Sequence, residues 1–317
     1  MMTITLLMAL TGAAVLPADE PEPTPTPQAL QWVTDISVAR EMAAKEGKDI
    51  LINFTGSDWC GWCKRLDGEV FSLPAFHETA GKQYVYLYLD FPRSEEAKAK
   101  VIDEDLNNKN RDEMGVDGFP TIILADSAMR PYGRTGYQPG GPEKYLEHLA
   151  ELRTKGEKVK ALVSAENDEQ IQKLLPEAMA VMLEQNLLGY PAFDKFLTLA
   201  EKSADPQLVA QIAQFRATQE LNKLLNTQEP DFPVLVKFLQ DNAKLQGPEA
   251  LNALWFCSQW LTENDRKEDA KTFLNRMMAD PLVKENDRGL QMIEKALEEL
   301  DSKEASHDHD GDGVPDH

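Results

Sequence analysis

The chain has few cysteines, a shortage of positive charge and no long hydrophobic run, and each shortage excludes a class of protein. Three cysteines in 317 residues are too few for a scaffold held together by disulfide bonds. With 33 basic against 54 acidic residues, the net charge of −21 excludes electrostatic binding to nucleic acid or to an anionic membrane surface. After the N-terminus, no segment approaches the roughly 18 uninterrupted apolar residues of a membrane span, so we expect no transmembrane segment in the mature chain.

The N-terminal residues are typical of an exported protein. Residues 1–18 carry no charge and include an apolar run from Ile4 to Val15, which is too short to span a bilayer but suits the core of a signal peptide. A basic residue before the run is missing, and a buried N-terminal helix is the alternative. In residues 19–29, proline alternates with polar residues, which predicts an extended linker. We expect a periplasmic or secreted protein.

The rest of the chain has the composition of a globular protein, and its length predicts about two domains. In residues 30–156, apolar runs typical of strands alternate with segments of helical spacing, which predicts an α/β domain with a central sheet. The strands are expected at Asp49–Phe54, Tyr84–Asp90 and Thr121–Ala125, with a hairpin arm in Arg130–Tyr137, and the helices at Ile36–Lys45, Cys60–Val70, Ser94–Asn107 and Pro142–Arg153.

Residues 157–300 contain no convincing strand. Apolar stripes at helical spacing, such as Leu235, Phe238 and Leu239, predict an all-α domain. Its helices are long enough to stack in pairs as an α-solenoid, although no repeat of fixed period is present. We expect this domain to provide a partner-binding or dimer surface.

Cys60 and Cys63 form a Cys-x-x-Cys pair where a strand and a short turn lead into a helix. This spacing brings the two sulfurs close enough for a disulfide, and the helix start stabilises a thiolate on Cys60 through unpaired N–H groups and the helix dipole. A thiolate is the species that attacks disulfides. Two alternatives remain, a structural disulfide, which would stabilise little across so small a loop, and half of a zinc site, for which no second pair of ligands is evident.

Two motifs carry a resemblance to a known family. The sequence Trp59-Cys60-Gly61-Trp62-Cys63-Lys64 is followed about sixty residues later by Val116-Asp117-Gly118-Phe119-Pro120-Thr121. Together they make residues 30–155 resemble the thioredoxin superfamily, in particular its exported members. The resemblance implies a mixed sheet flanked by helices and a cis proline at Pro120 facing the cysteines.

The resemblance also implies roles for individual residues. Cys60 would attack a substrate disulfide, and the more shielded Cys63 would resolve the mixed disulfide. The residues implied in substrate binding are Trp59, Gly61, Trp62, Phe119, Pro120 and Thr121. One departure concerns Asn53, which stands where many thioredoxins have a buried acid that transfers a proton, and Asp58, Glu69 or water would have to replace it.

The C-terminal tail, residues 301–317, is acidic and rich in histidine. Its aspartates Asp308, Asp310, Asp312 and Asp316 resemble the Asp-rich calcium repeats of thrombospondin type 3, and alternating carboxylates around glycines can wrap calcium. A single copy would bind weakly, and a solvated acidic tail is the alternative. The third cysteine, Cys257, lies in an apolar stretch and is expected in the core.

The sequence therefore predicts an exported thiol–disulfide oxidoreductase. It would reduce or exchange disulfides in protein substrates through Cys60 and Cys63, with an unidentified redox partner and no organic cofactor. One alternative is a non-catalytic binding protein in which the helical domain is the working part. Another, which depends on the tail alone, is a calcium-dependent adhesin.

Overall fold

The computed structural model describes residues 32–305. The predicted signal peptide, the linker and the four predicted calcium ligands lie outside these residues. The first half contains α1 (Ile36–Glu46), β1 (Asp49–Thr55), α2 (Gly61–Leu66), η1 (Asp67–Phe71), α3 (Pro74–Ala80), β2 (Tyr84–Asp90), α4 (Glu95–Lys98), α5 (Glu104–Glu113), β3 (Thr121–Ala125), β4 (Pro131–Thr135) and α6 (Gly141–Val163). The second half contains α7 (Asp168–Glu184), η2 (Pro191–Phe193), α8 (Asp194–Ala200), α9 (Pro206–Leu225), α10 (Phe232–Asp241), α11 (Pro248–Glu263), α12 (Lys267–Ala279), α13 (Pro281–Lys284) and α14 (Asp287–Ala305).

A four-stranded mixed sheet lies at the centre of the first half, in the order β2–β1–β3–β4. β1 pairs in parallel with β2 and antiparallel with β3, which in turn pairs antiparallel with β4. The central strands are apolar and almost entirely buried, as expected for strands covered on both faces. The predicted mixed sheet flanked by helices is confirmed.

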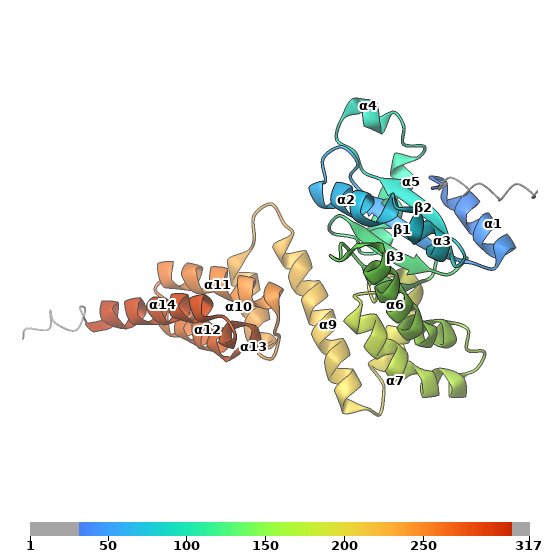
Figure 1. The fold of residues 1–317 in the computed structure, drawn as a ribbon. Coiled ribbons are helices and arrows are strands. Elements are labelled where there is room, and N and C mark those ends of the chain that lie inside the picture. Colours follow the sequence, from blue (N-terminus) through green and yellow to red (C-terminus); the bar gives the residue numbers. More distant parts are fainter. Residues whose placement is uncertain (1–31, 306–317) are drawn as a thin grey trace, which may run out of the picture.

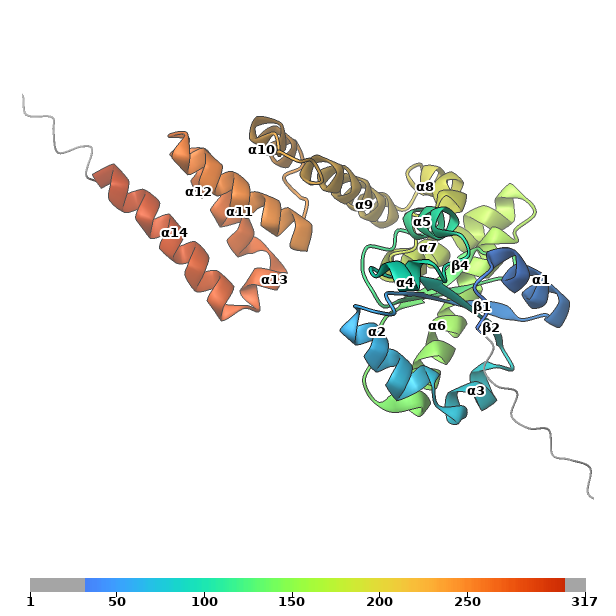
Figure 2. The same cartoon turned by 90° about the horizontal axis from the view of Figure 1, so that it is seen from above.

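Successive side chains of β1 point to opposite faces of the sheet, so they belong to two different hydrophobic clusters. Ile50, Ile52 and Phe54 pack with α1 and with the segment that follows α5. Leu51 faces the other way, into a larger cluster built on α2, η1, α3 and α6. Figure 2 shows α2, α3 and α6 together on one side of the sheet, with α5 on the opposite side.

One predicted helix is divided in two. The sequence predicts a single helix over Ser94–Asn107, whereas the structure has a short α4 and a separate α5. The side chain of Ser94 accepts from the backbone of Ala97, and that of Asp103 accepts from Leu106, so each helix has its own N-cap. The cap at Asp103 starts a new helix at a point where the charged residues and the helical spacing predict one continuous helix.

The predicted division at residues 156–157 falls in the middle of α6, so the helical region does not begin there. At Gly156 the helix approaches Tyr132 of β4 so closely that a Cβ atom would lie 2.3 Å from the ring. The cluster under the sheet continues through α6 into α7, η2, α8 and the first part of α9. These helices complete the core of the α/β region.

A second core begins within α9. Leu208 and Ile212, near the start of this helix, belong to the cluster under the sheet, whereas Leu221, near its end, belongs to a cluster formed with α10–α14. Figures 1 and 2 show α9 extending from the α/β body to the α10–α14 body. The change of core therefore occurs between Ile212 and Leu221.

The α10–α14 body contains the apolar stripes predicted from the sequence. Leu235 and Leu239 of α10 are buried and Phe238 packs partly against the same cluster. α11, α12 and α14 lie side by side (Figure 2). The prediction of an all-α region after the α/β region is confirmed. Within residues 32–305, no helix combines the length and apolar character needed to cross a membrane.

Candidate functional site

Cys60 and Cys63 lie where the chain leaves the central strand of the sheet. β1 ends at Thr55, a short turn follows, and α2 begins at Gly61 with Cys60 as its N-cap residue. The two cysteines form a disulfide, with Cα atoms 5.2 Å apart. Sγ of Cys60 accepts from the backbone N–H of Cys63 at 3.1 Å. The N–H of Cys63 is one of the backbone donors in the first turn of α2 that have no partner within the helix. A hydrogen bond from such a donor stabilises a thiolate on Cys60.

Both cysteines are largely shielded in this disulfide form. Their exposed fractions are 4% for Cys60 and 5% for Cys63. The family resemblance implies that Cys63 is the more shielded of the two, whereas the oxidised pair shows no such difference.

The predicted cis proline lies beside this turn. The Phe119–Pro120 peptide bond is cis, and Thr121, the next residue, starts β3 and pairs with Phe54 near the end of β1. The hydroxyl of Thr121 donates to the carbonyl of Gly118 at 2.8 Å, which closes the loop before the proline. The strand pairing thus brings together two motifs that are about sixty residues apart in the sequence.

Trp59 is fixed on one side of the cysteine pair. Its indole Nε1 donates to the carbonyl of Phe91 at 2.8 Å, and the guanidinium of Arg93 lies 4.0 Å from its ring centroid. Its edge meets Phe119, with ring centroids 5.7 Å apart. A Cβ atom at Gly56 would lie 2.5 Å from the indole, so this turn residue has to be glycine. Phe91 and Arg93 belong to no motif, so no sequence signal identified them.

Trp62 lies on α2 between the cysteines and contacts Tyr137, which follows β4, at a centroid distance of 5.1 Å. Tyr137 is a further residue that sequence reasoning missed. It contacts Trp62 because of the path that the chain takes after β4 ends at Thr135, which the sequence pattern does not show. Gly61, by contrast, has no steric reason to be glycine, since a Cβ atom there would meet nothing within 4 Å.

Asn53 is buried in β1, with 5% of its surface exposed, and its Oδ1 has no hydrogen-bond partner among the described residues. It faces the same side of β1 as Leu51, whose cluster includes Leu66 of α2 and Val70 of η1. The amide therefore occupies the α2 side of the sheet, where the family resemblance leads us to expect an acid.

Each of the two acids considered as a replacement, Asp58 and Glu69, has hydrogen-bond partners of its own. Asp58 accepts from the backbone N–H groups of Ser94 and Arg93, and the bond from Ser94 is the main reason that its pKa is lowered to about 2. The pKa of Glu69 is also lowered, first by the hydroxyl of Tyr137 and then by Arg65. Both carboxylates are held ionised by partners of their own.

Cys257 lies in α11, away from the sheet, and is fully buried. Burial raises the pKa of its thiol to about 12, so it is protonated and unreactive, as predicted for a core residue. Across residues 32–305, no three His, Cys, Asp or Glu side chains are grouped so that they could hold a metal ion.

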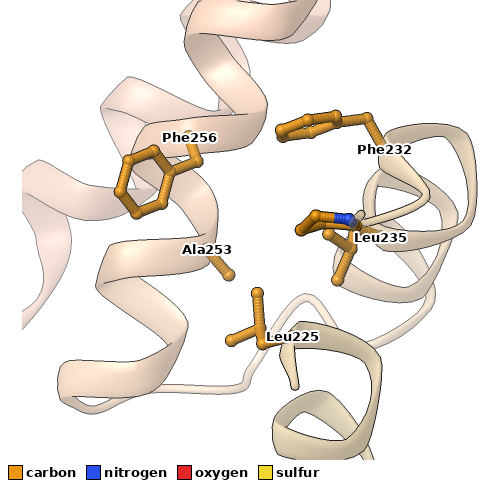
Figure 3. A pocket seen from close by; sticks show the side chains of 6 residues that line it. Leu225, Phe232, Leu235, Ala253 and Phe256 are labelled. Carbon is orange, nitrogen blue, oxygen red and sulfur yellow. The ribbon is translucent and has the colours of Figure 1, made fainter. Parts of the chain in front are cut away.

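The helical body contains an apolar pocket with a volume of about 200 Å³. Figure 3 shows side chains from three helices around it, with Leu225 from α9, Phe232 and Leu235 from α10, and Ala253 and Phe256 from α11. Phe256 is more than half exposed. The lining is entirely apolar, so the pocket suits an apolar group and offers no chemistry of its own.

Comparisons with known proteins agree with this geometry. A family model described as a thioredoxin-like domain matches residues 36–153. The disulfide bond reductase DsbH of Chlamydia pneumoniae is 30% identical over 123 residues, which are 38% of this chain and 70% of that protein.

Two solved structures are also similar in part. One, titled DsbH oxidoreductase, has a TM-score of 0.35 and 28% identity, and the match covers 43% of this chain and 95% of that one. The other, the oxidised C-terminal domain of Neisseria meningitidis DsbD, has a TM-score of 0.28 and 18% identity, with coverage of 39% and 100%. The family model and the match to most of the Chlamydia protein show that this chain belongs to the thioredoxin-like family.

Proposed function

We propose that this protein is an exported thiol–disulfide oxidoreductase that reduces or exchanges disulfides in protein substrates. The observation that carries the proposal is the Cys60–Cys63 pair at the start of α2, next to the cis bond before Pro120. The relative in Chlamydia pneumoniae, named a disulfide bond reductase, supports the chemistry and favours reduction as its direction. The uncharged run in residues 1–18 supports export.

The reaction uses the two cysteines alone and transfers two electrons. In the reduced protein, the Cys60 thiolate attacks one sulfur of a substrate disulfide, forms a mixed disulfide and releases the other substrate sulfur as a thiolate. Cys63 then attacks Sγ of Cys60 and releases the second substrate thiol, which leaves the Cys60–Cys63 disulfide. A thiol reductant returns two electrons to this disulfide and closes the cycle.

The local structure supports each step. The Cys63 N–H that donates to Sγ of Cys60 stabilises the attacking thiolate, and the spacing of one helical turn keeps the resolving sulfur within bonding distance. Asn53 cannot exchange a proton, and Asp58 and Glu69 are otherwise engaged, so we expect water or the substrate thiol to carry the proton to and from Cys63. The α10–α14 body would supply a contact for a partner or for a second copy.

Reduction of insulin in the presence of dithiothreitol tests the proposal. We expect the wild type to accelerate precipitation of the reduced insulin chains, and Cys60→Ser to fall to the dithiothreitol background because the attacking sulfur is gone. Cys63→Ser, reduced, freed of dithiothreitol and then mixed with insulin, should accumulate the mixed disulfide, which is visible on a non-reducing gel. Cys257→Ala is the matched control and should behave as the wild type. Equal, slow rates for wild type and Cys60→Ser would contradict the proposal.

The apolar pocket favours a second candidate function, a binding protein in which the helical region does the work. That function predicts the opposite pattern for binding to a partner. Cys60→Ser would leave binding intact, and Phe256→Asp, which places a charge at the exposed rim of the pocket, would abolish it.

A further inference from the structure

Trp62 is the more open of the two indoles that flank the disulfide. Its exposed fraction is 56%, against 36% for Trp59. Trp62 is absent from all three hydrophobic clusters formed by the described residues, so it does not serve the core. An exposed tryptophan next to Cys63 is instead the type of side chain that dominates binding sites, since its large rigid surface gains most when a ligand covers it.

The indole is held in place by an ordered cluster. The ring of Tyr137 meets it at a tilt of 43°, and the guanidinium of Arg65 lies 5.5 Å from the Trp62 ring and 5.2 Å from the Tyr137 ring. The carboxylate of Glu69 joins the cluster, because one oxygen accepts from Arg65 Nε at 2.7 Å and the other from the Tyr137 hydroxyl at 2.6 Å.

This arrangement has a consequence for binding. Tyr137 and Arg65 contact the indole, and Tyr137 itself packs partly against the core under the sheet. The cluster therefore anchors a side chain that is still more than half open to solvent. An indole that is already fixed loses little conformational entropy when a ligand stacks on it, and the full contact energy then favours binding.

We propose that Trp62 is a specificity-determining residue for substrates of the proposed function, and that Arg65, Glu69 and Tyr137 are the residues that position it. Its open surface takes an aromatic side chain that neighbours the cysteine of a substrate disulfide. The sulfur exchange is unchanged, with Cys60 attacking and Cys63 resolving. The preference of aromatic rings for one another predicts about a 2- to 12-fold advantage for such substrates.

Two fluorogenic peptides test the inference. Each contains one intramolecular disulfide, and they differ only in whether phenylalanine or serine precedes the first cysteine. We would measure kcat and KM with dithiothreitol as reductant for the wild type, Trp62→Ala and Tyr137→Phe. Met292→Ala is the matched control, because Met292 is 48% exposed on α14, far from the cluster in the fold.

We expect the wild type to favour the phenylalanine peptide about 2- to 12-fold in kcat/KM, mainly through a lower KM. Trp62→Ala should bring this ratio close to 1. Tyr137→Phe keeps the ring but loses the hydroxyl bond to Glu69, and should give an intermediate ratio. Met292→Ala should keep the wild-type ratio.

Other outcomes separate the inference from the proposed function. If the wild type reduces both peptides equally well, or if Trp62→Ala keeps the ratio while both rates fall, the specificity role is wrong and the oxidoreductase function stands. If the wild type reduces neither peptide and does not accelerate insulin reduction, the proposed function fails and the inference fails with it.

Discussion

Asn53 stands where the resemblance to thioredoxins leads us to expect a buried acid. A buried amide whose Oδ1 has no partner takes the place of an ionisable group on the α2 side of the sheet. An unpaired buried polar atom costs stability, about 1–3 kcal/mol in mutational data. Because the amide does not titrate, the surroundings of the cysteines keep a constant charge at this position across the physiological pH range.

The variant Asn53→Asp tests how much stability a buried carboxylate would cost at this position. Burial raises the pKa of a carboxyl group above its unfolded value, so the charged form is the one disfavoured in the folded state. The variant should therefore match the wild type in stability below about pH 4 and lose roughly 1–3 kcal/mol as the pH rises through the raised pKa. Urea unfolding at pH 4 and pH 8 measures this difference.

The matched control for that measurement is Asn286→Asp. Asn286 is exposed and its Oδ1 accepts from the backbone of Gly289, a capping role that aspartate fills equally well. It should show no loss of stability between the two pH values. A similar loss in both variants would mean that burial of Asn53 is not the cause.

Much of the candidate site could be predicted at the residue scale. The two cysteines and Pro120 are marked by local motifs, and the strand order brings them together. The partners of the two tryptophans could not be predicted, because Arg93 and Tyr137 reach the site through the ends of β2 and β4. Those ends are set by tertiary packing, and neither residue lies in a pattern that spacing reveals.

At the scale of the element, the length of α6 depends on packing and could not be read from the sequence pattern alone. Its first half was predicted, and the helix then continues past the predicted division because Gly156 allows it to lie against Tyr132. A glycine in mid-sequence is commonly a helix stop, whereas here it is a point of contact. The positions of β1, β2 and β3 were predictable from apolar runs, since a buried strand leaves that signature regardless of its partners.

Gly156→Ala tests this contact. Alanine favours the helix by up to about 1 kcal/mol over glycine, but its Cβ would lie 2.3 Å from the Tyr132 ring. Overpacking of this kind usually costs about 1–3 kcal/mol, so we expect a net loss in the free energy of unfolding. Thermal unfolding followed by circular dichroism provides the measurement.

Gly68→Ala is the control for that experiment. A Cβ atom at Gly68, in η1, would meet nothing within 4 Å, so the variant should be as stable as the wild type or slightly more stable. Equal effects of the two substitutions would show that helix propensity, and not the contact with Tyr132, governs position 156.

At the scale of the whole molecule, the sequence correctly indicated an α/β part followed by an α part, and the predicted division at residue 156 falls inside α6. The last strand, β4, ends at Thr135, whereas the core beneath the sheet extends to α9. Contacts between distant helices determine where a core ends, and a single sequence does not show them. Figure 1 makes the difference plain, since α6 and α7 lie against the sheet region and not against α10–α14.

Two shortened chains test where the first body ends. A chain ending at Gly156 lacks the end of α6 and all of α7–α14, and with them the part of the cluster under the sheet that runs from Val159 to Ile212, so we expect it to aggregate or to unfold without a cooperative transition. A chain ending at Glu220 keeps Leu208 and Ile212 and should unfold cooperatively and retain the disulfide. Gel filtration and thermal unfolding distinguish the two. Cooperative unfolding of the shorter chain at the temperature of the longer one would contradict the structure.

The position of Cys257 limits which disulfide isomers the protein can form. Three cysteines allow three pairings, and two of them would join α2 to the interior of α11, in the other core. Neither can form unless the α10–α14 body opens, because the thiol is fully buried and protonated. A protein that repeatedly makes and breaks disulfides is thereby protected from scrambling its own, and each catalytic cycle returns it to the same covalent state.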